Sequence, residues 1–273
     1  MPPTAASLTR SSRDTARSIR GGAAMHAGAR AGFVAAGVVH ILLGVVALGV
    51  AFGGGGSADQ SGALAALRSE PGGPVLLWVV VLALWALSLF LLLSAALVRG
   101  TGKSAWYHRG KYASTGIAYL AVGLTGVGVA RSGSSSSAGK TRAWSARLLD
   151  APGGKALLVV VALVVLGVAV YFVMKGATHG YRKDISVPAG LAGRAVEALA
   201  TVGYVAKGVA LAVVAVLTGV AALTSDPQKS AGLDGALKSL AGLPFGVVLL
   251  VVVAAGLVAY GCYFFARARY ARL

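Results

Sequence analysis

Hydrophobic residues along the chain fall into six long blocks separated by shorter polar and glycine-rich stretches. A helix that crosses a bilayer needs about 20 predominantly apolar residues, and each block comes close to or exceeds that length. The blocks are continuous and do not alternate between apolar and polar positions, so the pattern favours helices over the strands of a membrane β-barrel. We predict six membrane-spanning helices, at residues 31–52, 75–98, 112–130, 156–175, 201–223 and 245–266.

The six blocks form three copies of a two-helix unit. A Pro-x-Gly turn precedes the second, fourth and sixth blocks, which read PGGPVLL from Pro71, PGGKALL from Pro152 and PFGVVLL from Pro244. In the odd-numbered blocks an aromatic residue stands four positions before a glycine, which makes three glycines equivalent: Gly37, Gly116 and Gly208. Self-similarity of this kind indicates a repeat architecture. Because small residues let membrane helices approach closely, we expect the three glycines to pack against neighbouring helices.

Each copy holds an even number of spans, so all copies enter the membrane from the same side. This favours parallel repeats around a pseudo-threefold axis along the membrane normal over the inverted repeats common in transporters. Before each turn proline runs a short amphipathic stretch, interpreted as a short interfacial helix, with a plain polar loop as the alternative. The predicted organisation is a disordered basic cytoplasmic tail at 1–28, then repeats at 29–104, 105–184 and 185–273.

This all-α, six-span, three-copy design resembles the bacterial integral-membrane family catalogued as domain of unknown function 1206, over roughly residues 28–272. The copy that begins GYVAKGV at Gly203 lies closest to the family pattern, while the first two copies carry Ala36 and Thr115 where the third has Lys207. The resemblance implies three paired-helix repeats in a bacterial membrane and implies no activity.

Composition and charge support the membrane interpretation. The chain is 57% hydrophobic and 12% charged, whereas soluble domains average about 25% charged residues, so an ordinary soluble enzyme is excluded. A net charge of +17 would suggest nucleic acid in a soluble protein, but here we expect no nucleic-acid binding. Sixteen Lys and Arg lie on the side of the two termini and eight on the other. The positive-inside rule therefore places both termini in the cytoplasm and predicts contact with anionic headgroups of the plasma membrane.

Two ionisable residues, His40 and Lys207, fall inside predicted spans, where such groups are expensive and often functional. The repeat alignment puts them on faces equivalent to that of Tyr119, with Thr115 at the position that matches Lys207. If these faces meet, the four residues form a polar cluster near the axis, which could serve a small-ion or solute channel or carrier. The alternative is packing, with the Lys207 stem reaching toward the interface and His40 bonded to a backbone carbonyl.

The residues that usually carry membrane chemistry are sparse. No Asp or Glu falls within the six predicted spans, and we find no catalytic motif. One cysteine and four histidines are too few and too scattered for a metal site, and we expect no cofactor. The YRKD segment at 181–184 is predicted to be a solvated turn. We predict a non-enzymatic protein that acts through lipid or other membrane proteins, with a channel or carrier as the alternative and a membrane enzyme as the third class.

Overall fold

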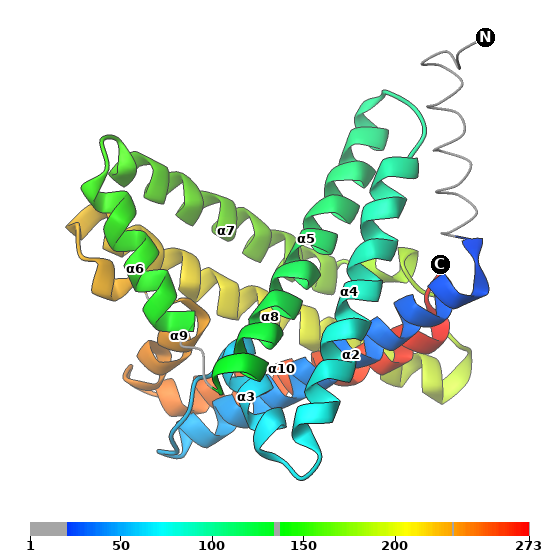
Figure 1. The fold of residues 1–273 in the computed structure, drawn as a ribbon, viewed down its shortest axis with the longest axis horizontal. Coiled ribbons are helices and arrows are strands. Elements are labelled where there is room, and N and C mark those ends of the chain that lie inside the picture. Colours follow the sequence, from blue (N-terminus) through cyan, green and yellow to red (C-terminus); the bar gives the residue numbers. More distant parts are fainter. Residues whose placement is uncertain (1–20, 134–136, 231, 273) are drawn as a thin grey trace.

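The computed structural model describes residues 21–133, 137–230 and 232–272, and within these residues the regular structure is helical apart from one isolated β-bridge between Ile185 and Ala271 (Figure 1). Six helices are long and apolar enough to cross a membrane. They are α2 (Ala23–Ala51), α4 (Gly73–Leu97), α5 (Lys103–Ser132), α7 (Gly154–Ala177), α8 (Gly190–Thr224) and α10 (Gly246–Tyr270). The predicted all-helical, six-span fold class is therefore confirmed.

Three of these helices begin well before the predicted spans. α2 begins at Ala23 rather than at 31, α5 at Lys103 rather than at 112, and α8 at Gly190 rather than at 201. Hydropathy marks only the apolar part of a helix, whereas the backbone hydrogen bonds continue through polar turns at its end. The longer α8 also takes in Glu197, whose Oε1 lies 2.6 Å from Nε of Arg182. Of the predicted tail at 1–28, residues 1–20 lie outside the described residues.

Each repeat consists of a long helix, a short helix and a second long helix. The short helices are α3 (Gln60–Ser69), α6 (Ser137–Asp150) and α9 (Gly232–Ala241), at the amphipathic stretches predicted to be helical. We call the end of the molecule that carries them the loop side (Figure 1). The opposite end, where α2 begins and α10 ends, is the terminal side; it also holds two further parts of the chain, the α4–α5 connection and the 3₁₀ helix η1 (Gly180–Lys183).

The turn that opens the second long helix is built alike in the three repeats. The residue after each turn proline adopts a left-handed backbone: Gly72 and Gly153 with φ 75°, and Phe245 with φ 58°. These residues follow the predicted turn positions Pro71, Pro152 and Pro244. Positive φ is accessible to glycine but strained for a bulky residue. The third turn therefore carries backbone strain that the first two avoid.

The three equivalent glycines occupy related helix contacts. A β-carbon built on Gly208 would lie 2.8 Å from the carbonyl oxygen of Ala169 on α7, and Gly37 meets the backbone of α10 in the same way. The carbonyl of Gly116 accepts a hydrogen bond of 2.7 Å from Oγ of Ser88 on α4. In each case the first long helix of one repeat packs on the second long helix of the preceding repeat: α5 on α4 and α8 on α7. The first repeat follows the third in this order, so α2 packs on α10. This is the relation that three copies around one axis require.

The second repeat departs from the other two. α2 packs on α4 in the first repeat and α8 packs on α10 in the third, but within the residues described α5 and α7 of the second repeat are not packed together. Figure 1 shows α5 steeply inclined to α7, with α4 accompanying α5. The ring of six helices is therefore open between α5 and α7, and this opening positions the candidate site.

Candidate functional site

Two of the predicted intramembrane polar residues meet directly. Nζ of Lys207 on α8 lies 3.1 Å from Nε2 of His40 on α2. The other ring nitrogen of His40, Nδ1, lies 2.7 Å from the carbonyl oxygen of Ala36. A carbonyl only accepts, so we assign the proton to Nδ1, and Nε2 then accepts from Lys207. Each side chain thus has a hydrogen-bond partner within the helices, as buried polar groups require.

Aromatic rings enclose these two residues, which we call the sealed pair. The His40 ring stacks on Phe264 at a centroid distance of 5.5 Å and meets Tyr260 edge-on at 5.0 Å. Nζ of Lys207 lies 5.0 Å from the ring centre of Phe172 and 4.8 Å from that of Tyr260, within the range of a cation–π contact. Only 8% of the His40 surface is exposed. The geometry is that of a satisfied, packed polar contact.

The other two members of the predicted cluster lie elsewhere. Thr115 and Tyr119, both on α5, line a cavity whose wall does not include His40 or Lys207. Tyr260 separates the two regions, since it contacts the sealed pair and also lines that cavity. The structure therefore brings together two of the four predicted residues. The other two are kept apart because α5 leans away from α7 in the open second repeat.

This cavity has a volume of about 410 Å³ and lies between α5 and α7, against α8 and α10. Its wall is largely aromatic: Tyr119 from α5, Phe172 from α7, Tyr204 from α8 and Tyr260 from α10. Arg267 of α10 adds a cation at the terminal side. The volume falls within the range of about 300–1,000 Å³ that is typical of small-molecule sites.

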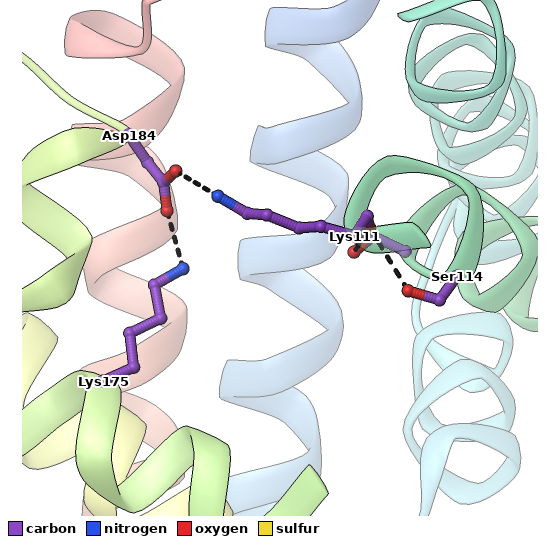
Figure 2. A network of polar contacts seen from close by, with 5 residues as sticks. Lys111, Ser114, Lys175 and Asp184 are labelled. Atoms are coloured by element: carbon purple, nitrogen blue, oxygen red, sulfur yellow. Dashed lines mark hydrogen bonds and ion pairs between the residues drawn. The ribbon is translucent and has the colours of Figure 1, made fainter. Parts of the chain in front are cut away.

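An ion-paired carboxylate joins the two separated helices at the edge of this cavity. Nζ of Lys111 on α5 lies 2.6 Å from Oδ1 of Asp184, and Nζ of Lys175 on α7 lies 2.6 Å from Oδ2. Figure 2 shows the two lysines reaching the same carboxylate from different directions, with Ser114 beside Lys111. We call this arrangement the Asp184 bridge. It spans the opening that direct helix packing leaves between α5 and α7.

The surroundings of Asp184 fix its charge. Burial by itself would raise the pKa of the carboxyl, because it removes water from the ionised form. The charges of Lys175 and Arg267, together with hydrogen bonds from Lys111 and Lys175, outweigh burial and hold the pKa of Asp184 well below its ordinary value. The carboxylate therefore stays ionised at every physiological pH.

Arg267 is the third cation of this region, and its contacts differ from those of the two lysines. Among the described residues, its buried Nε has no hydrogen-bond partner. Its guanidinium carbon lies 4.6 Å from the ring centre of Phe33 and 5.6 Å from that of Phe264, so aromatic faces supply its contacts. An unsatisfied buried donor costs about 1–3 kcal/mol. Arg267 thus brings a positive charge to the wall of the cavity, while its Nε stays enclosed.

A second cavity of about 510 Å³ adjoins the first on the terminal side. The two cavities share four lining residues and so lie side by side, and we call them together the α5–α7 cleft; the shared residues are Tyr107, Lys111, Tyr171 and Lys175. Lys183, an exposed residue, and Asp184 stand at the outer part. The cleft thus consists of an outer cavity on the terminal side and an inner aromatic chamber between helices.

The chemistry of the inner chamber is that of binding an anion. Its lining contains the cations Lys111, Lys175 and Arg267 but no carboxylate and no imidazole that could act as a general base. No group of three or more His, Cys, Asp or Glu side chains that could hold a metal ion occurs in the described ranges 21–133, 137–230 and 232–272. Cations with aromatic walls suit a negatively charged head with an apolar body.

The sequence analysis missed the residues of the Asp184 bridge. The solvated turn predicted at 181–184 is wrong for two residues, since Tyr181 is fully buried and Asp184 is largely enclosed. The hydroxyl of Tyr181 donates to the carbonyl of Glu197 at 3.0 Å. The signal available in the sequence was Asp184 itself, because it is one of few acids on the strongly basic side of the chain and is therefore expected to pair with a cation. Its partner Lys111 lies 73 positions away, and only the fold brings the two together.

Comparison with known proteins supports the repeat. The model of the family Domain of Unknown Function (DUF1206) matches three times, at residues 31–97, 110–179 and 202–271. The chain is 31% identical over 249 residues to the uncharacterized protein YxxB of Bacillus subtilis (strain 168), a match that covers 86% of each chain. No solved structure matches this chain.

Proposed function

Because the chain belongs to the family Domain of Unknown Function (DUF1206), whose name assigns no activity, we propose a function from its own residues. It is a multi-span membrane protein, and we propose that it binds anionic lipid in the α5–α7 cleft without catalysing a reaction. The observation that carries this is the chamber wall, where Lys111, Lys175 and Arg267 stand among aromatic rings with no carboxylate in the same lining.

The proposal includes the location. The terminal side faces the cytoplasm of the plasma membrane, as the excess of Lys and Arg on that side supports. Anionic lipids of the cytoplasmic leaflet attract basic residues at the membrane surface. Trp106 and Tyr107, which line the chamber and are more than half exposed, suit the headgroup level of a bilayer.

The channel or carrier alternative has weaker support. A conducting path near His40 and Lys207 needs water or an exchangeable polar partner, but both side chains are engaged with each other and enclosed by rings. Glu197, the acid carried by α8, pairs with Arg182 and not with Lys207, so it is not placed to trade ions or protons with the pair. We therefore assign the pair to packing.

Lipid binding is tested on the purified full chain in detergent by native mass spectrometry. Phosphatidylglycerol and phosphatidylcholine of the same acyl chains compete at equal concentration. We expect phosphatidylglycerol to be retained several-fold better, and equal retention of the two lipids would overturn the proposal. In parallel, proteoliposomes are assayed for potassium and proton flux with the wild type, His40→Ala and Lys207→Ala. Flux that the substitutions abolish would establish the channel instead.

The orientation is tested by cysteine labelling in a Cys262→Ser background. Lys183→Cys reports the terminal side and Ser57→Cys reports the loop side. In intact bacterial cells we expect a membrane-impermeant maleimide to label position 57 and to leave position 183 unlabelled. Labelling at 183 alone would reverse the proposed topology.

A further inference from the structure

The α5–α7 cleft carries a net positive charge among the described residues. Three cations, Lys111, Lys175 and Arg267, line the inner chamber, and the carboxylate of Asp184 bonds to the two lysines. Three positive charges and one negative charge leave a net charge of +2 on this cation cluster. Lys183 stands farther out, where solvent screens it. Net charge enclosed among aromatic rings is costly unless an opposite charge accompanies it.

The cluster also has free hydrogen-bond donors. Each lysine ammonium has three N–H donors, and the Asp184 bridge uses one from Lys111 and one from Lys175. Nε of Arg267 is itself enclosed, so this side chain contributes its charge to the chamber wall. The remaining N–H donors of the two lysines lie beside the chamber, which suits a ligand group with several acceptor oxygens.

The chamber has a route for an apolar chain. Val168 and Tyr171 of α7 line the chamber and are 41% and 38% exposed. Among the described residues α5 and α7 are not extensively packed together. The wall of the chamber thus continues onto a surface that faces lipid in a membrane-spanning helix.

We infer that the chamber binds the terminal phosphate of a lipid that ends in a phosphate monoester or diphosphate, with the chain leaving between α5 and α7. This rests on the proposed function and names its ligand class. A phosphate monoester carries a charge of about −2 near neutral pH and three strong acceptor oxygens. It therefore neutralises the +2 cluster, whereas a phosphodiester carries a single negative charge and leaves one positive charge uncompensated.

The decisive experiment compares lipids of equal acyl chains on the full-length wild type at pH 7.5 by native mass spectrometry. Phosphatidic acid supplies the monoester, phosphatidylglycerol the diester and phosphatidylcholine the zwitterion. We expect phosphatidic acid to bind about tenfold more tightly than phosphatidylglycerol. Equal binding of these two, both above phosphatidylcholine, overturns the inference and leaves the proposed function standing. Equal binding of all three overturns both.

A second arm separates a lipid from a soluble source of phosphate. Inorganic phosphate and glycerol 3-phosphate are added to the complex with phosphatidic acid. We expect neither to displace the lipid at a tenfold excess, because neither supplies the chain that fills the opening between the helices. Displacement at equal concentration would overturn the assignment to a lipid.

Variants test the charge balance. Lys111→Gln, at a partly exposed position, lowers the cluster to +1, and we expect the preference for phosphatidic acid over phosphatidylglycerol to fall at least threefold. The matched control is Lys155→Gln on α7, where Nζ contacts a backbone carbonyl at the loop side; we expect no change. A preference that Lys111→Gln leaves intact, or that both substitutions reduce equally, overturns the inference. Monodispersity on size exclusion confirms that each variant is folded.

Discussion

In the sealed pair, Lys207 has His40 as its acceptor and two aromatic rings around its Nζ, while in the α5–α7 cleft two lysines share one carboxylate and Arg267 stands beside them. The contrast follows from helix packing. α8 meets α7 closely at Gly208, next to Lys207, whose Nζ contacts the Phe172 ring of α7 and has His40 as its acceptor. α5 does not pack on α7, so a chamber stays open between cations. Whether a polar residue inside a membrane protein has a structural role or is available to a ligand therefore depends on whether helix packing supplies its hydrogen-bond partners.

The largest expected effect breaks the sealed pair. His40→Ala removes the acceptor of Lys207 and the ring that stacks on Phe264, and we expect it to destabilise the protein by about 4 kcal/mol. The measurement is the thermal unfolding midpoint in detergent. Adding Lys207→Leu should recover at least about 1 kcal/mol, because no unpaired amino group remains. The control, His108→Ala at an exposed position, should change stability by less than about 0.5 kcal/mol. Equal losses of stability in His40→Ala and His108→Ala would contradict a stabilising contact between His40 and Lys207.

The next effect concerns the Asp184 bridge. Asp184→Asn leaves Lys111 and Lys175 facing each other without their carboxylate, and we expect a loss of about 3 kcal/mol. Because the folded pKa of Asp184 lies below its ordinary value, its contribution is fully present above about pH 4 and is lost as pH falls further. The gap in unfolding midpoint between wild type and variant should stay constant from about pH 8 to 5 and then narrow. A gap that widens in acid would refute the assignment.

A smaller effect tests the close helix contact at Gly208, next to Lys207. Gly208→Ala places a β-carbon 2.8 Å from a backbone carbonyl of α7, so the helices have to separate, at a cost of about 2 kcal/mol. Gly167→Ala on α7 is the matched control, because a β-carbon there meets nothing within 4 Å. It should be neutral or slightly stabilising, since alanine favours a helix over glycine. Equal unfolding midpoints for the two variants would show that the close contact at Gly208 does not stabilise the packing of α8 on α7.

The smallest effect lies at the loop side, far from both regions. Phe245→Gly relieves the positive φ of 58° at a side chain that is 88% exposed, and we expect a gain of about 1 kcal/mol. Gly72→Ala introduces the opposite strain at the equivalent turn and should destabilise by a similar amount. Neither change should alter lipid binding. A lower unfolding midpoint for Phe245→Gly would mean that the ring anchors the turn in the interface.

The sequence by itself determined the number of spans, the three repeats and the short helices between them. Each follows from local information: runs of apolar residues long enough to cross a bilayer, and motifs repeated at Pro71, Pro152 and Pro244. It also singled out His40 and Lys207, since ionisable residues stand out against an apolar background.

Only the tertiary structure decided which polar residues meet. His40 contacts Lys207 across 167 positions, while Thr115 and Tyr119 line another space because α5 leans out of the ring. The Asp184 bridge arises from residues 73 positions apart, at an opening that the repeat pattern does not encode. A repeat in sequence makes helix faces equivalent, but how far each pair of helices closes depends on the packing of all their side chains together.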